Sequence, residues 1–432
     1  MTSVGRTTCV VVGGGPAGMV LGLLMGRAGV EVTVLERHAD FLRDFRGDTV
    51  HASTLTLLDE LGLGDRFAAI PQRRLQRAQL QLDGGTAQVM DLSRLPGAHQ
   101  HIALVPQWDF LDLLAAAAHD EPTFTLRRNA DVTGLIRERG RIAGVCYLDR
   151  TDHTEHQLGA SLTVACDGRG STVRTAAGLV PRSFGVPIDV WWFRMPRRPD
   201  DPEGGVGRVS TGQLAGMLDR GEYWQCVYLI AKGADTALRA AGIEAFRASI
   251  TALIPWMADR VAALASFDEV KLLDVRLDRL RRWHADGLLL IGDAAHAMSP
   301  VGGVGINLAV ADAVAAARLL APALRRDGTV AISMLRRVQR RRWWPTAVIQ
   351  GGQRLAHRAL FGRRDALPDA AGPPRPASAT STFTHPLPVP LRVMARFPAL
   401  QTIPARLIAI GPLPEHAPEW ARRPPGPRTP HR

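Results

Sequence analysis

Lysine is almost absent from this sequence. Only Lys232 and Lys271 are lysines among the 53 basic residues of the 432-residue chain, and the rest are arginines spread along its length. The net charge of +12 therefore reflects a composition bias, and no nucleic-acid partner is expected. The densest basic stretch, RRVQRRRWW at residues 336–344, is expected to line solvated helix edges through the pairs Arg336/Arg340 and Arg337/Arg341. A dimer contact or attraction of an anionic substrate is the alternative for this stretch.

Cysteine is also scarce, and its copies lack the spacing of a metal or disulfide site. All four fall in apolar, strand-like runs, and none belongs to a CxxC pair: Cys9, Cys146, Cys166 and Cys226. The pairs His99/His101 and His153/His156 are poor metal ligands because no cysteine or acidic cluster accompanies them. We therefore expect reduced thiols in a cytoplasmic protein without a bound metal.

Long apolar runs are missing as well. No uninterrupted run approaches the length of a membrane span, so a soluble body without an integral membrane segment is expected. With 46% hydrophobic and 22% charged residues, the chain has an ordinary globular composition and enough length for more than one core. One short apolar stretch near the N-terminus, TTCVVVGGGPAGMVLGLLMG (Thr7–Gly26), matches either an export leader or the start of a nucleotide-binding fold.

The glycines of this stretch favour the nucleotide-binding fold. Gly13, Gly15 and Gly18 follow the β-branched run Val10–Val12 and open a helical pattern. In such a turn the first glycine makes the tight bend, the second lets the main chain approach a pyrophosphate, and the third lets the helix pack closely on the strand. The helix N-terminus then offers free N–H groups to the phosphates.

The next predicted strand supplies a carboxylate for a ribose. EVTVL (Glu31–Leu35) ends in Glu36, roughly twenty residues after the glycines, where a carboxylate can accept hydrogen bonds from ribose hydroxyls. A carboxylate at this position would repel a 2′-phosphate. The resident nucleotide is therefore expected to carry a plain adenosine, as in FAD or NAD.

Two later segments repeat this arrangement of a buried strand that delivers a polar residue beside a glycine. They are Leu162–Gly168, within LTVACDGRGSTVR, and Leu288–Asp293, within LLLIGDAAH. Ligands of open parallel sheets bind at the carboxyl ends of the strands. The three strand ends are therefore expected to line one extended dinucleotide.

The order and spacing of these motifs resemble the class A flavoprotein monooxygenases of the para-hydroxybenzoate hydroxylase fold. The similarity runs from Thr7 to about Leu320: GGGPAG matches the first FAD fingerprint, ACDGRGSTVR the Asp-Gly motif with Ser171 and Arg174, and GDAAHAMSPVGGVGIN the Gly-Asp motif. The resemblance implies an α/β fold in which a Rossmann-like FAD-binding domain of three-layer ββα architecture is interleaved with a mostly β-sheet substrate domain. A C-terminal helical segment would follow.

The implied domains alternate along the chain. The FAD-binding domain would take residues 1–74, 98–179 and 275–325, and the substrate domain a hairpin at 75–97 and residues 180–274. C-terminal helices and a proline-rich segment would occupy 326–420, before a disordered tail at 421–432. Within the substrate region, a helical segment is expected over 243–264 and a long alternating strand over 271–280.

The resemblance also assigns cofactor contacts. Glu36 would hold the adenosine ribose with Arg37 over the adenine side, and Arg46 would contact the cofactor. Gln107 would lie near the ribityl chain, Asp293 would accept hydrogen bonds from the ribityl and pyrophosphate region, and Asp167 would mainly fix its loop. The full expected set is Gly13, Gly15, Pro16, Ala17, Gly18, Glu36, Arg37, Arg46, Gln107, Asp167, Gly292, Asp293, Pro300, Gly303, Gly305, Ile306 and Asn307.

The last helix of the resemblance offers a physical reason for flavin reactivity. Gly303, Gly305, Ile306 and Asn307 lie at its start, so unpaired N–H groups there can face the flavin pyrimidine. Reduced flavin carries negative charge around N1 and the C2 carbonyl, and a helix N-terminus stabilises such charge. Pro300 resembles the family proline whose backbone lies beside the ring; the alternative is that it only ends the turn.

The implied reaction is oxygen insertion. Because the chain has a single nucleotide fingerprint, NAD(P)H would dock transiently, deliver hydride and leave. O2 would then add to the flavin to give a C4a-hydroperoxide, which transfers one oxygen atom to an aromatic or polyketide-like small molecule in a site that excludes water. The protein is expected to be a monomer or a homodimer.

Few residues are candidates for the substrate side. Tyr223 and Tyr228 lie at opposite parity in the strand EYWQCVYLI, so at most one of them can face the pocket. Trp192 and Arg194 share a strand face in WWFRMP, where they either line the pocket or bind an anionic group, or else pack in the core. The expected catalytic set is Pro300, Arg194, Tyr228 and His51.

Three other functions stay open. A flavin-dependent halogenase shares the fold, but WWFRMP departs from its Trp-x-Trp-x-Ile-Pro motif, and Lys232 and Lys271 are poorly placed for its active-site lysine. A non-oxygenating FAD oxidoreductase fits the same cofactor residues. A non-catalytic Rossmann-type binding protein that has lost flavin is disfavoured by Asp293 and the glycine-rich helix start, and it would be colourless.

Overall fold

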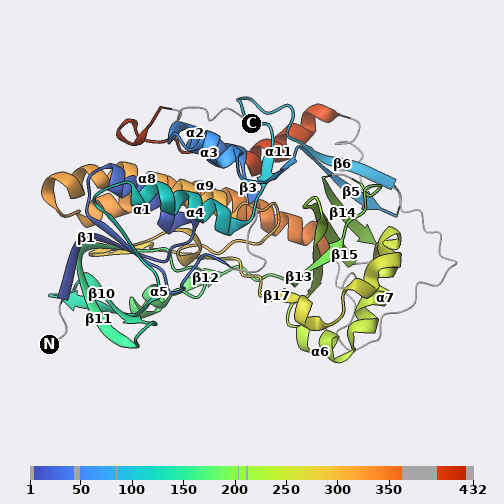
Figure 1. Cartoon of the computed structure of the whole chain (residues 1–432), viewed down its shortest axis with the longest axis horizontal. Helices are drawn as coiled ribbons and strands as arrows, with labels where there is room; N and C mark the ends of the chain where they lie inside the picture. Colours follow the sequence, from blue (N-terminus) through green and yellow to red (C-terminus); the bar gives the residue numbers. More distant parts are fainter. Residues whose placement is uncertain are drawn as a thin grey trace.

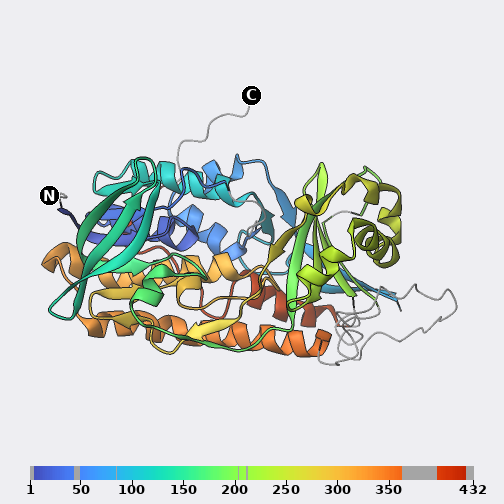
Figure 2. The same ribbon diagram turned by 90° about the horizontal axis from the view of Figure 1, so that it is seen from below.

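The computed structural model describes residues 4–42, 49–83, 85–202, 204–210, 213–361 and 397–424. Figures 1 and 2 show two parts side by side: a sheet covered by a layer of long helices, and a second sheet backed by α6 (Asp235–Ala240) and α7 (Ile243–Leu253). The long helix α9 (Ile332–Phe361) runs from the first part toward the second.

The parallel strands of the first sheet end in a single row. Val12 pairs with Leu35 on one side and with Ala165 on the other, and Ala165 pairs with Leu290. Because these strands are parallel, the loops that follow them emerge at the same edge of the sheet. The strand order is β19 (His284–Ala285), β20 (Leu288–Leu290), β11 (Thr154–Ala165), β1 (Val4–Val12), β2 (Val32–Leu35), β8 (Phe124–Arg127).

Two different layers cover this sheet. Helices pack on one face and two antiparallel strands on the other, namely α1 (Pro16–Arg27), α4 (Gln107–His119) and α8 (Gly305–Asp327) against β9 (Ala130–Glu138) and β10 (Arg141–Asp149). Side chains alternate along β1, so Cys9 and Val11 pack among the helices while Val10 and Val12 pack toward β9 and β10. The predicted α/β class with a three-layer ββα arrangement is confirmed.

The second sheet joins a hairpin from early in the chain to strands more than one hundred residues later. Its order is β17 (Lys271–Leu273), β13 (Ile188–Pro196), β16 (Tyr223–Ala231), β15 (Gln213–Asp219), β14 (Gly205–Ser210), β5 (Arg77–Leu82), β6 (Gly85–Asp91). One face of this sheet packs on α6 and α7 through a core that includes Trp191, Phe193 and Phe246. Part of the opposite face, at Ala78 and Leu218, packs against a core that includes Ala405 and Ala409 from near the C-terminus.

A short three-stranded sheet lies between the two parts. It has the order β3 (Thr49–Val50), β7 (Ile102–Leu104), β4 (Arg73–Leu75). The remaining elements include α2 (Ala52–Glu60), α3 (Gly64–Ala68), α5 (Thr172–Ala176), β12 (Pro181–Ser183), β18 (Asp278–Leu280) and α11 (Thr402–Ala409).

Two predicted elements are shorter than the sequence pattern suggests. The helix expected over 243–264 ends at Leu253, and Pro255–Ala263 forms a 3-10 helix, because a proline has no N–H and disfavours helical backbone in the residue before it. The strand expected over 271–280 is interrupted between β17 and β18. Residues in this interruption bind the Lys232 ammonium rather than a neighbouring strand.

The basic stretch on α9 is only partly solvated. The predicted pair Arg336/Arg340 is exposed, and so is Arg337 of the second pair. Arg341 instead forms a two-pronged ion pair with Glu415 at 2.6 and 3.0 Å, and Arg342, only 1% exposed, donates to Asp312 at 3.0 Å. The expectation that the whole stretch lines solvated edges is therefore wrong, because two of its arginines bind carboxylates from other segments.

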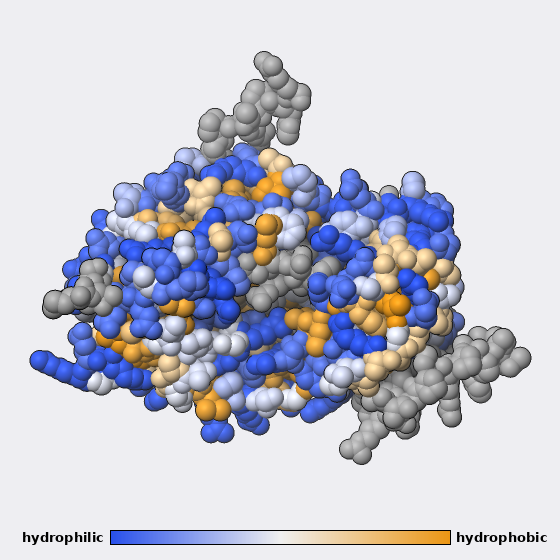
Figure 3. Space-filling view, turned by 60° about the horizontal axis from the view of Figure 1, so that its bottom comes forward, coloured by the Kyte–Doolittle hydropathy of each residue, from blue (hydrophilic) through white to orange (hydrophobic). Residues whose placement is uncertain are grey.

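Helix α8 is long and apolar enough to cross a membrane by length and composition. In this structure 67% of its most apolar window is buried inside the protein, and the helix packs against α1 and α9. Figure 3 shows one face of the molecule, on which hydrophilic side chains predominate and apolar ones form small groups. Within the described residues, α8 is thus a core helix.

Candidate active site

The turn after β1 requires glycine at two positions. Gly13 has φ +102°, and a Cβ atom there would lie 2.6 Å from the carbonyl oxygen of Cys166. A Cβ atom at Gly18 would lie 1.9 Å from the carbonyl oxygen of Gly13, so only glycine allows α1 to approach the strand this closely. These contacts match the turn and packing roles that the motif predicts.

Gly15 differs from these two because it faces open space. A Cβ atom at Gly15 would meet nothing within 4 Å. Gly15 is the N-cap residue of α1, no side chain caps the helix there, and Pro16 and Ala17 begin it. The free N–H groups of the first turn and the positive end of the helix dipole therefore face a space that an anionic group can enter.

Glu36 follows β2, and its carboxylate contacts the glycine turn after β1. Its side chain is 7% exposed. One carboxylate oxygen accepts a hydrogen bond from the N–H of Gly14 at 2.9 Å, and the other accepts one from the N–H of His38 at 3.1 Å. Arg37 is exposed, whereas Arg46 lies outside the described residues. The Glu36 carboxylate, predicted to bind the ribose, is thus held beside the glycine-rich turn after β1.

Asp167, which follows β11, fixes the start of α5. Its Oδ2 accepts the N–H of Val173 at 3.1 Å, and Ser171 caps the same helix by accepting the N–H of Arg174 at 2.9 Å. The other carboxylate oxygen, Oδ1, is buried and has no hydrogen-bond partner. Burial raises the pKa of this carboxyl, against the opposing effect of its hydrogen bonds.

The Gly292–Asp293 turn meets both α1 and α8. Gly292 has φ +58°, and a Cβ atom there would lie 3.5 Å from the methyl group of Ala17 and 3.3 Å from that of Ala309. Asp293, with a side chain 31% exposed, accepts a hydrogen bond from Arg169 at 3.2 Å. The fingerprint helix α1, the Gly292–Asp293 turn and helix α8 therefore lie in direct contact.

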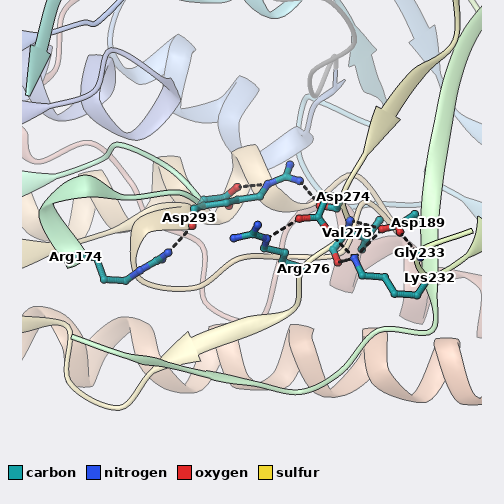
Figure 4. A network of polar contacts seen from close by, with 9 residues as sticks. Arg174, Asp189, Lys232, Gly233, Asp274, Val275, Arg276 and Asp293 are labelled. Atoms are coloured by element: carbon teal, nitrogen blue, oxygen red, sulfur yellow. Dashed lines mark hydrogen bonds and ion pairs between the residues drawn. The ribbon is translucent and has the colours of Figure 1, made fainter. Parts of the chain in front are cut away.

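Two arginines join the motif loops to each other. Arg174 donates to the carbonyl oxygens of Ala294, at 3.1 Å, and of Arg169. Arg169 in turn reaches Asp293 and the carbonyl oxygen of Asp274. Figure 4 shows this chain of contacts continuing from Asp293 toward the second sheet.

The turn before α8 rests on β3. Gly303, with φ +64°, donates its N–H to the carbonyl oxygen of Pro300 at 2.9 Å, and its own carbonyl oxygen accepts the Thr49 hydroxyl at 3.1 Å. Gly305 begins α8 without a side-chain cap, and a Cβ atom there would meet nothing within 4 Å. Ile306 is half-buried. The side-chain oxygen of buried Asn307 accepts a hydrogen bond from the hydroxyl of Thr54 at 2.5 Å.

His51 lies behind this turn, beside Gly303. It is 1% exposed, its Nδ1 contacts the carbonyl oxygen of Ile408 at 2.8 Å, and its Nε2 has no hydrogen-bond partner. Burial lowers its pKa to about 4, so the imidazole is neutral at pH 7. His51 is therefore a buried, neutral imidazole, and its catalytic role stays a prediction.

A cavity of about 390 Å³ lies between the second sheet and the first part. Its walls come from both: Arg194, Arg220, Tyr223 and Gln225 on one side, and Pro71, Gln72, Arg73, Leu104, Pro106 and Trp108 on the other. Gln107 sits between two of the lining residues, at the first position of α4. The prediction that Arg194 lines a pocket agrees with this placement.

Tyr228 lies on the core side of β16. It is 7% exposed and packs edge-on against Phe246 of α7, with ring centroids 5.3 Å apart, and burial raises its pKa. Tyr223, five residues earlier on the opposite face of β16, lines the cavity instead. Tyr228 as a catalytic candidate is therefore corrected to a core residue.

One row of paired residues connects the cavity to the turn before α8. Across the three-stranded sheet Arg73 pairs with Leu104, and Leu104 pairs with Thr49, whose hydroxyl binds Gly303. Neighbouring strands lie about 4.8 Å apart, so Thr49, which holds this turn, lies one strand spacing from Leu104 and two, roughly 10 Å, from Arg73. Both Leu104 and Arg73 line the cavity.

Lys232 joins β13 to the segment after β17 through ion pairs and a hydrogen bond. Its ammonium binds Asp189 at 2.7 Å, Asp274 at 2.5 Å and the carbonyl oxygen of Val275 at 2.8 Å (Figure 4). Burial alone would lower the pKa of Lys232, but the two carboxylates outweigh it and raise the pKa.

An acidic cluster does accompany one of the histidine pairs. Asp149, Asp152 and His156 bring one ligand atom each to within 4.8 Å of one another at the hairpin between β10 and β11. The expectation that no such cluster exists is therefore wrong. Hydrogen bonds within the turn already engage Asp152, which accepts the N–H and the hydroxyl of Thr154 at 2.9 and 2.6 Å.

Comparisons with known proteins agree with this geometry. A family model described as an FAD binding domain matches residues 6–347. The 6-methylpretetramide 4-monooxygenase of Streptomyces rimosus is 36% identical over 326 residues, which cover 74% of this chain and 77% of that protein. The 12-dehydrotetracycline 5-monooxygenase/anhydrotetracycline 6-monooxygenase of Streptomyces rimosus subsp. rimosus is 29% identical over 72% of this chain, which spans 61% of that longer relative.

Solved structures share the fold. The crystal structure of PqsL, a probable FAD-dependent monooxygenase from Pseudomonas aeruginosa, superposes with a TM-score of 0.71 at 22% identity over 84% of this chain and 98% of that one. The family model covers most of the chain, and the Streptomyces rimosus relative matches about three quarters of it. The chain therefore belongs to the class A FAD-dependent monooxygenases.

Proposed function

We propose that this monooxygenase uses NAD(P)H and O2 to hydroxylate an aromatic polyketide. The observation that carries the proposal is the row Arg73–Leu104–Thr49, because its first two residues line the cavity and its third holds the Gly303 turn. Two relatives are named for tetracycline-type intermediates, which supports the substrate class. The cavity volume of about 390 Å³ lies in the range of roughly 300–1,000 Å³ that holds one drug-sized molecule.

Two features of the site fit FAD. The space in front of Gly15 can admit a pyrophosphate, and the buried Oδ1 of Asp167 lacks the partner that a ligand hydroxyl would provide. In this proposal the first turn of α1 holds the pyrophosphate, Glu36 holds the adenosine ribose, and Asp293 holds the ribityl end. Bound FAD supplies the redox chemistry, since it accepts hydride from NAD(P)H and activates O2.

The chain positions the reaction in three ways. The first turn of α8, at Gly305 and Ile306, has no side-chain cap, so its N–H groups would stabilise negative charge on bound FAD. Thr49 and the Pro300 carbonyl oxygen hold the Gly303 turn in place. The cavity walls would exclude water from the substrate, which favours oxygen insertion over loss of peroxide.

The domain division also remains part of the proposal. We take residues 1–74, 98–179 and 275–325 as the FAD-binding domain and residues 75–97 and 180–274 as the substrate domain. The participation of β5 and β6 in the second sheet supports the assignment of the early hairpin to the substrate domain.

Halogenase chemistry is disfavoured by the lysines. Lys232 is held by two carboxylates, and Lys271 is an exposed residue of the sheet-edge strand β17. Neither belongs to the described lining of the cavity. Oxygen transfer needs no lysine of this kind, so the described site fits a hydroxylase better.

The proposal is tested with the purified full-length protein and isotopically labelled dioxygen. FAD-loaded protein is supplied with NADH or NADPH and a panel of aromatic polyketides, phenols and quinones. We expect substrate-stimulated NAD(P)H oxidation and one labelled oxygen atom in the product, as mass spectrometry measures. Stimulated oxidation of neither nucleotide, or a halogenated product when halide is added, would overturn it.

A further inference from the structure

The described lining of the cavity is rich in positive charge. Three of its ten residues are arginines, and none of the ten is acidic. These arginines come from separate parts of the fold: Arg73 from β4, Arg194 from β13, and Arg220 from the turn between β15 and β16. Three independent segments therefore bring a guanidinium group to one cavity.

The guanidinium groups are braced by neighbouring side chains. Arg194 lies over the ring of Tyr223, 4.9 Å from its centroid, and Arg220 donates its Nε–H to buried Gln225 at 2.7 Å. A Cβ atom at Gly221 would lie 2.8 Å from the Nη2 of Arg73, so the Arg73 guanidinium rests against the turn that carries Arg220. Such bracing lowers the entropy lost when a ligand binds.

Charge-assisted hydrogen bonds from guanidinium to an oxyanion are among the strongest polar contacts in proteins. The aromatic faces of Tyr223 and Trp108 line the same cavity and can stack on a flat ring. A planar molecule with a carboxylate, enolate or phenolate oxygen would use both kinds of contact at once. A neutral molecule of the same shape would use only the aromatic one.

We propose that Arg73, Arg194 and Arg220 make this cavity selective for an aromatic substrate that carries an oxyanion. The inference rests on the proposed function, because it assumes that the cavity receives the substrate, and it adds the charge of that substrate. It also adds Arg73 and Arg220, which belong to none of the sequence motifs, to Arg194 as specificity-determining residues.

The test uses two probes of the same shape, 3-hydroxy-2-naphthoate and its neutral amide, 3-hydroxy-2-naphthamide. Each is titrated into the full-length FAD-loaded protein, and binding is followed by quenching of tryptophan fluorescence. Trp108 lines the cavity, and a Trp108→Phe variant identifies its share of the signal. We expect the naphthoate to bind at least about tenfold more tightly than the amide.

Single replacements then assign the preference. Arg73→Met, Arg194→Met and Arg220→Met should each reduce the ratio of the two affinities by about threefold to tenfold and leave amide binding nearly unchanged. Arg337→Met is the matched control, because it removes the same charge from an exposed position on α9. If a variant fails to fold, the two affinities are measured for the wild-type protein at raised salt concentration. Salt should weaken binding of the naphthoate and leave binding of the amide unchanged.

Equal affinity for the two probes would overturn the inference, as would an unchanged ratio in all three cavity variants or an equal loss in Arg337→Met. These results differ from failure of the proposed function. A protein that prefers the naphthoate but neither holds FAD nor consumes O2 contradicts the function, whereas an active monooxygenase without the preference contradicts only the charge selection.

Discussion

The Gly15→Ala variant separates a role in ligand binding from a role in folding. Gly15 has φ −72° and ψ −176°, a conformation that alanine adopts without strain, and its new methyl group would meet nothing within 4 Å. Losing glycine at an N-cap costs less than about 1 kcal/mol. The stability of the protein without FAD should therefore change little.

The same methyl group would occupy the space proposed for the pyrophosphate. Forcing an extra methyl group into a filled, close-packed contact costs about 1–3 kcal/mol. Converted to affinity, this is a loss of about fivefold to 150-fold in FAD binding. We therefore expect Gly15→Ala to reduce FAD affinity more than it reduces the stability of the apoprotein. This difference would show that the space in front of Gly15 is occupied by the ligand and not by the folded chain.

The assay is a flavin titration of the apoprotein, followed by fluorescence, together with thermal unfolding. Gly351→Ala is the matched control: it makes the same change at an exposed position of α9 with no atom within 4 Å, and should keep FAD affinity while raising stability slightly. Gly18→Ala provides the opposite case and should destabilise the apoprotein, because its methyl group would collide with the Gly13 carbonyl oxygen. Wild-type FAD affinity in a folded Gly15→Ala protein would refute the reasoning.

Four further outcomes are expected. Asp293→Ala should lower FAD occupancy after gel filtration, and unchanged occupancy would remove Asp293 from the cofactor site. Glu36→Arg should abolish FAD loading through charge and shape, so normal loading would contradict the ribose role. Asp312→Ala should cost about 3 kcal/mol in urea unfolding, because it removes the nearer of two carboxylates from buried Arg342, leaving only Glu415 at 3.4 Å; a loss below about 1 kcal/mol would show that the pair is unimportant. Unfolded His51 takes up a proton near pH 6.5 but folded His51 only near pH 4, so between these values the unfolded state binds more protons and stability falls as the pH is lowered. This contribution is roughly 3 kcal/mol. His51→Gln should remove it, and identical pH profiles of thermal unfolding for the two proteins would disprove the assignment.

The cofactor half of the fold was predictable because its signals are local. Each strand end and its following turn occupy a few consecutive residues, and backbone geometry restricts them strongly: Gly13 and Gly18 tolerate no Cβ atom. The rule that parallel strands present their ends at one edge then brings distant motifs together. The contact between Gly292 and Ala17 is a direct result.

The second sheet and the cavity beside it depend on partners that local patterns do not contain. Alternation along β16 predicts that Tyr223 and Tyr228 face opposite sides, but which side is core depends on where α7 packs. Only the pairing of β4, β7 and β3 places Arg73 near the Gly303 turn. Strand parity could have selected Tyr223 if the docking of α7 had been known.

The arginines illustrate the same limit. Helical spacing predicts which positions of α9 share a face, and Arg337 and Arg340 are exposed accordingly. Arg342 is buried because Asp312 and the Glu415 segment supply carboxylates 30 and 73 residues away in the sequence. A buried charge is stable only with such partners, and spacing along one helix does not reveal them.

The most direct test of the account is the flavin content of the purified full-length protein. Flavin released by denaturation is identified by chromatography and compared with protein concentration, and stripped protein is dialysed against FAD. The account predicts a yellow protein that binds one FAD per chain. A folded, colourless protein that takes up no FAD would contradict it.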